Sequence, residues 1–69
     1  MAKIQFDSFD IDETAAIVDA LAATGKIESV HYESGFAPDG LITVTVIGSY
    51  DTIVALCMTI DVDVEEIQN

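Results

Sequence analysis

The chain has 69 residues and a net charge of −11, with thirteen Asp and Glu residues against two lysines, Lys3 and Lys26, and no arginine. A chain of this length predicts one domain, residues 1–69, near the lower limit of what folds alone. The apolar content of 51% argues against intrinsic disorder, and the scarcity of cations argues against direct binding to nucleic acid or to anionic membranes. No stretch approaches the roughly 20 apolar residues of a membrane span, so we expect a cytoplasmic protein.

The N-terminal residues predict a strand followed by the start of a helix. Polar and apolar side chains alternate over residues 3–9, which is typical of a half-buried strand. Asp10 and Glu13 have the spacing of a helix capping box, and Asp12 is the competing cap. Acidic residues here also suit the positive end of the helix dipole.

The next segments predict a helix and a hairpin. Residues 14–24 are alanine-rich with one apolar face, and Gly25 is expected to end the helix in a left-handed conformation. Residues 27–34 alternate again, and residues 41–47 are β-branched at nearly every position, so both are expected to be strands. The intervening Pro38-Asp39-Gly40 sequence fits a type I turn.

The C-terminal third predicts a second helix and a last strand. Ser49 or Asp51 is expected to cap the helix. Its apolar stripe is predicted to consist of Tyr50, Ile53, Val54, Cys57 and Ile60. Residues 61–65 alternate strictly between acidic and apolar side chains and predict a terminal strand.

The order strand, helix, strand, strand, helix, strand resembles the split βαβ, ferredoxin-like superfold. The resemblance is one of element order over the whole chain. It implies an α+β domain in which two helices cover one face of a four-stranded antiparallel sheet, with the last strand at an edge beside the first. Because this fold carries many unrelated functions, it does not indicate an activity.

In that arrangement the acidic residues of the first and last strands form one ridge, and those before the first helix lie near its end. Phe36, in a glycine-rich loop, is expected either to fold over the core or to be an exposed anchor of a contact surface. The candidate partner-binding residues are therefore Asp7, Asp10, Asp12, Glu13, Phe36, Asp61, Asp63 and Glu65.

The uncompensated charge favours a non-enzymatic protein that acts by protein–protein contact. The leading hypothesis is an inhibitor that occupies a basic, nucleic-acid-binding surface of a partner complex, since opposite charges steer such association. The alternative is a dimeric, small-molecule-sensing regulatory module of the same fold, with its ligand beside the loops of Gly25 and Ser49. A third interpretation is an enzyme subunit without chemistry of its own. The acidic residues could also serve only solubility, or protect an edge strand from aggregation.

The sequence predicts no catalytic residue, metal site or cofactor. Asp61, Asp63 and Glu65 have the spacing that begins a calcium loop, but the glycine and the final glutamate of that loop are missing. His31 and Ser29 lack a nucleophile-elbow or oxyanion signature. Cys57 lies in an apolar stripe and is expected to be a small buried hydrophobic residue.

Overall fold

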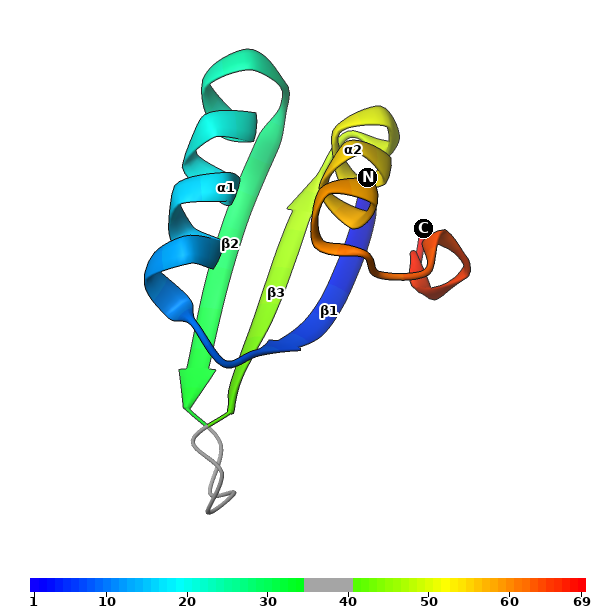
Figure 1. The fold of residues 1–69 in the computed structure, drawn as a ribbon. Helices are drawn as coiled ribbons and strands as arrows, with labels where there is room; N and C mark the ends of the chain where they lie inside the picture. Colours follow the sequence, from blue (N-terminus) through cyan, green and yellow to red (C-terminus); the bar gives the residue numbers. More distant parts are fainter. Residues whose placement is uncertain (35–40) are drawn as a thin grey trace.

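A computed structural model of the chain describes residues 1–34 and 41–69. Figure 1 shows its elements in sequence colours. They are β1 (Ala2–Ser8), α1 (Ile11–Thr24), β2 (Ile27–Ser34), β3 (Ile42–Gly48), α2 (Tyr50–Ile60) and a short 3₁₀ helix, η1 (Val64–Glu66). The predicted turn at residues 38–40 and the predicted anchor Phe36 lie outside the described residues.

The described strands form a three-stranded antiparallel sheet in the order β1-β3-β2. The central strand β3 pairs with both neighbours, so that Ile4 and Val30 both lie opposite Val46. A register shift interrupts β2 between Ile27 and Ser29. Both helices lie on one side of this sheet (Figure 1). The prediction of an α+β domain with two helices and an antiparallel sheet is confirmed.

The core lies between the helices and the sheet. Its strand residues follow the alternation that the sequence predicts, and its helix residues face them. The fully buried members are Ala2, Ile4, Val18, Val44, Val46, Ile53, Leu56 and Cys57. A chain this short leaves many further apolar side chains only partly covered, among them Phe6, Ile17 and Ile60.

The ends of α1 confirm one prediction and correct another. Asp10 is the N-cap, because its carboxylate accepts a hydrogen bond of 3.1 Å from the Glu13 backbone N–H. Gly25 does end the helix, but its backbone is extended (φ −121°) rather than left-handed. Glycine is required here because a larger residue would not fit: a Cβ at this position would lie 2.6 Å from the Thr52 hydroxyl oxygen. Gly25 therefore permits a close approach between two loops.

Helix α2 begins at the predicted cap, but its buried face is rotated from the prediction. The Ser49 hydroxyl accepts a hydrogen bond from the Thr52 N–H, at 3.4 Å. Leu56, which the predicted stripe omitted, is fully buried, whereas Tyr50 is 51% exposed. The buried positions Ile53, Leu56 and Cys57 still recur at helical spacing. Tyr50 is the first residue of the helix, and its exposed side chain does not belong to the buried face.

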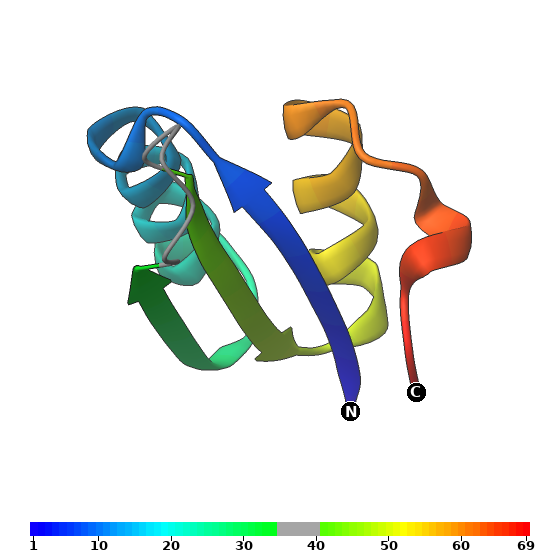
Figure 2. The same ribbon diagram turned by 90° about the horizontal axis from the view of Figure 1, so that it is seen from below.

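The predicted strand over residues 61–65 is wrong. Asp61 is the C-cap of α2 in the left-handed conformation (φ 60°, ψ 41°), which turns the chain away from the helix axis. The Asp63 carboxylate then accepts a hydrogen bond from the Glu65 N–H, at 2.9 Å, and starts η1. In the segment after α2, only Gln68 pairs with β1, through one antiparallel bridge to Lys3. Figure 2 shows this C-terminal segment beside β1.

Candidate functional site

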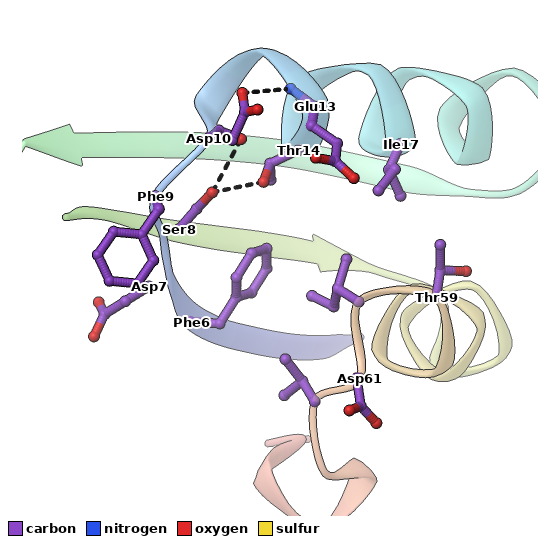
Figure 3. A pocket seen from close by; sticks show the side chains of 12 residues that line it. Phe6, Asp7, Ser8, Phe9, Asp10, Glu13, Thr14, Ile17, Thr59 and Asp61 are labelled. Atoms are coloured by element: carbon purple, nitrogen blue, oxygen red, sulfur yellow. Dashed lines mark hydrogen bonds between the residues drawn. The ribbon is translucent and has the colours of Figure 1, made fainter.

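A pocket of about 380 Å³ opens where the N-terminus of α1 and the C-terminus of α2 meet the end of β1 (Figure 3). The two helices run in opposite directions along the sheet, so these termini lie at the same end of the molecule. We call this feature the acidic pocket because four carboxylates belong to its lining. The lining consists of Phe6, Asp7, Ser8, Phe9, Asp10, Glu13, Thr14, Ile17, Thr59, Ile60, Asp61 and Val62.

The α1 side of the acidic pocket is fixed by hydrogen bonds at the junction with β1. The buried hydroxyls of Ser8 and Thr14 are 2.7 Å apart, and Ser8 also donates to the Asp10 carbonyl at 3.2 Å. Asp10 in turn caps the helix through the Glu13 N–H. These hydrogen bonds connect the start of α1 to the end of β1, while the exposed Glu13 side chain belongs to the pocket lining.

Two phenylalanines give the acidic pocket an apolar surface. Phe6 is partly buried against the core, whereas Phe9 is 79% exposed. Phe9 occupies the position before the helix cap, where an apolar residue often packs against the fourth helical residue. Here that residue is Thr14, whose hydroxyl is bonded to Ser8. Phe9 thus lacks its usual apolar partner, and its ring lies beside Asp7 at the rim (Figure 3).

The sequence pattern did not indicate Phe9 as a site residue, because the alternation over residues 3–9 predicts it as the last residue of the first strand. The signal that identifies it is the combination of an aromatic residue before the Asp10 cap and a polar Thr14 four residues into the helix. That combination removes the helix-capping contact that would otherwise cover the ring.

On the α2 side of the acidic pocket, Asp61 is the charged residue of the lining. Its N–H is bonded to the Cys57 carbonyl, and its left-handed backbone is one that glycine or asparagine adopts more readily. Its carboxylate also lies at the negative end of the helix dipole, where a cation is favoured. Among the described residues, no hydrogen bond to the Asp61 or Glu13 carboxylate is formed. Both carboxylates therefore remain open to a ligand.

The structure brings together half of the predicted partner-binding residues. Asp7, Asp10, Glu13 and Asp61 line the acidic pocket, although Asp7 also accepts a hydrogen bond of 3.1 Å from the Thr43 hydroxyl. The remaining described members, Asp12, Asp63 and Glu65, are exposed outside the pocket lining. The single straight ridge expected from a fourth strand is not formed, because residues 61–66 turn instead of extending.

The charge is distributed unevenly along the sheet. Every described Asp and Glu side chain is exposed. Lys3 pairs with Ile47, and Lys26 precedes the residue opposite Gly48, so both lysines lie at the end remote from the acidic pocket. The distance along β1 from Lys3 to Ser8 is roughly 17 Å, from about 3.4 Å per residue. This exceeds the Debye length of about 8 Å at physiological salt, so the lysines do not neutralise the pocket.

The loops that the sensing hypothesis assigned to a ligand pack directly against each other. Thr52 accepts a hydrogen bond from the Lys26 N–H at 3.0 Å and lies 2.7 Å from the Ser49 hydroxyl. The Ser49 N–H donates to the Lys26 carbonyl at 2.9 Å. These contacts join the two loops into one structural unit at the end of the sheet opposite the acidic pocket.

Other chemistry-bearing side chains are structurally accounted for. Cys57 is buried, and burial, followed by the negative charge of Asp63, raises the pKa of its thiol. Across residues 1–34 and 41–69, no group of three or more His, Cys, Asp or Glu side chains is arranged to hold a metal ion. Within the same ranges, neither helix is long and apolar enough to cross a membrane.

Comparison with protein-family models, with curated proteins and with solved structures gives no match to this chain.

Proposed function

We propose that this chain is a small, non-enzymatic protein that binds a basic protein or protein complex through the end of the molecule that carries the acidic pocket. In this proposal it acts as an inhibitor, by occupying a partner surface that otherwise holds nucleic acid. The observation that carries the proposal is that Asp7, Glu13 and Asp61, from three separate elements, line one opening remote from both lysines.

Physical considerations support a protein partner over a solubilising role alone. A carboxylate at the C-terminal end of a helix is unfavourable for folding, and Asp61 lies at that end of α2. A charge needed only for solubility could lie at any exposed position. An exposed aromatic beside carboxylates is also typical of interface anchors. The combination supplies both long-range steering and short-range apolar contact.

We also propose that the fold is ferredoxin-like, with the fourth strand reduced to a single bridge. In support, the C-terminal segment pairs with the outer edge of β1 through Lys3 and Gln68, the position that a fourth strand would occupy beside the β1-β3-β2 sheet. In this proposal a fourth strand would lie beside β1, at the edge where the sequence predicts the last strand.

The test of the proposed function is affinity capture from the native host, with the wild-type chain and with a Glu13→Gln/Asp61→Asn variant as baits. We expect the wild type to retain a basic protein that elutes as salt rises and that added nucleic acid displaces. The variant should retain less of it. A captured protein that binds both baits equally, or that resists salt and nucleic acid, would overturn the proposal.

A further inference from the structure

We propose that the outer edge of β2 pairs with the same strand of a second copy of this chain, antiparallel and around a two-fold axis at Tyr32. The sheets of the two copies would then form one continuous sheet. No residue of β2 belongs to the lining of the acidic pocket, so this surface is separate from the one in the proposed function.

The backbone groups of β2 that point off the sheet follow from the pairing of β1. Lys3 exchanges both of its backbone hydrogen bonds with Gln68, on the outer side of β1. Because successive residues of an antiparallel strand direct these groups to opposite sides, the residues on either side of Lys3 bond to β3. Continued across β3, the same alternation bonds Thr45 to His31 of β2. The N–H and C=O groups that remain directed away from the sheet are those of Val30, Tyr32 and Ser34.

The two edges of the sheet differ in how they are covered (Figure 1). The β1 edge is bridged by Gln68, whereas among residues 1–34 and 41–69 no backbone hydrogen bond reaches the outer side of β2. With eight residues, β2 is also the longest of the described strands, and it contains neither lysine nor proline, which commonly block edge pairing. Its register shift lies between Ile27 and Ser29, so residues 29–34 are regular. That regular segment is a template for another strand.

The side chains of this regular segment complement a second copy. With Tyr32 on the axis, Val30 lies opposite Ser34 of the second copy, and the outward backbone groups supply about six hydrogen bonds, two for each pair of facing residues. The two Tyr32 rings become neighbours on the helix side, where the residue is 40% exposed in one copy. On the other face, His31 of each copy lies opposite Glu33 of the other, which places an imidazole against a carboxylate twice.

Neighbouring registers fit less well. Facing residues of antiparallel strands share one face of the sheet, so the register changes only by moving the axis one residue at a time. With the axis at His31, two imidazoles face each other and Ser34 meets Glu28, which has no partner in β3. With the axis at Val30, Glu28 faces Tyr32, and with the axis at Glu33, two carboxylates face each other. Only the axis at Tyr32 joins regular residues and opposite chemistry.

Sedimentation equilibrium of the full chain, over a wide concentration range and at salt that screens the net charge, measures the association. We expect the mass to rise from one chain towards two. His31→Glu sets a carboxylate against Glu33 at two places and should weaken the dimer by about three- to thirtyfold. The matched control is Gln5→Glu, which adds the same charge to an exposed position of β1 and should change the dissociation constant less than about twofold.

Two further variants test the register. His31→Glu/Glu33→His exchanges the two groups, restores the opposite pairs and should return the dissociation constant to within about threefold of wild type. Ser34→Pro removes an outward N–H without affecting a bond to β3, and should weaken the dimer about fivefold or more. Circular dichroism checks the fold of each variant. If Ser34→Pro fails to fold, the exchange variant decides alone, because both of its positions are exposed.

Three results would overturn the proposal. These are a chain that stays monomeric at every concentration, a dimer that His31→Glu and Gln5→Glu weaken equally, and a folded exchange variant that does not regain association. Each of them leaves the proposed function standing, because binding of a basic partner at the acidic pocket does not use β2.

Discussion

Lys3 and Gln68 exchange two backbone hydrogen bonds, of 2.7 and 2.8 Å, across the outer edge of β1. These bonds attach the segment after α2 to the sheet without forming a strand. Ile67, the residue before Gln68, packs partly against the core. The contact thus covers an edge that would otherwise present unpaired backbone groups to another chain.

Gln68→Pro should lower the free energy of unfolding by about 1 kcal/mol. Proline removes the N–H that Gln68 donates to the Lys3 carbonyl, and a hydrogen bond of this kind contributes about 0.5–1.5 kcal/mol net. Urea unfolding followed by circular dichroism measures the change. Asn69→Ala, at the exposed neighbouring residue, is the control and should stay within about 0.5 kcal/mol of wild type. Equal effects of the two substitutions would show that the bridge contributes nothing.

Asp61→Asn should stabilise the protein by about 0.3–1 kcal/mol. The substitution removes a negative charge from the C-terminal end of α2 and places there a residue that tolerates the left-handed backbone. Asp12→Asn removes the same charge from the first turn of α1 and should destabilise by a similar amount. Thermal unfolding of the two variants gives the comparison. Shifts of the same sign would contradict the assignment of opposite dipole effects.

Leu56→Ala should cost about 2–5 kcal/mol, whereas Tyr50→Ala should cost much less. Leu56 is fully buried in the core, so its truncation leaves a cavity, while Tyr50 is 51% exposed. Denaturant midpoints measure both variants under one condition. Comparable losses would place the buried face of α2 where the sequence pattern first indicated it.

Stability should fall in alkaline solution partly through Cys57. Its pKa is raised in the folded protein above the ordinary value of 9.0, so the neutral thiol is favoured on folding. This contribution is fully present below about pH 9 and is lost as the pH rises through the folded-state pKa. Urea midpoints at neutral pH and near pH 10 should differ less in Cys57→Ala than in the wild type. An unchanged pH dependence in the variant would refute the role of Cys57.

Much of the fold follows from local sequence patterns. The alternation of Ile4 and Phe6, the β-branched run over residues 41–47 and the Asp10 cap each depend on neighbours within a few residues. A local helix end, which alternation alone does not reveal, accounts for the main difference. Residues 61–65 alternate like a strand, yet the left-handed Asp61 turns the chain before a strand can extend.

The candidate site was predictable only in part. The acidic residues were evident from composition, but their convergence depends on the antiparallel helices that place Glu13 and Asp61 at one end. Phe9 was not predicted, because the alternation over residues 3–9 assigns it to the first strand, whereas it lies before the Asp10 cap and is exposed.

We propose that the position of the carboxylates, and not the net charge, creates the binding surface. Calorimetric titration of an arginine-rich peptide tests it with two variants of equal charge, Glu13→Gln/Asp61→Asn at the acidic pocket and Glu28→Gln/Asp51→Asn at the opposite end. At low salt we predict that the first variant loses about tenfold in affinity and the second less than about twofold. Equal losses in the two variants would contradict the claim.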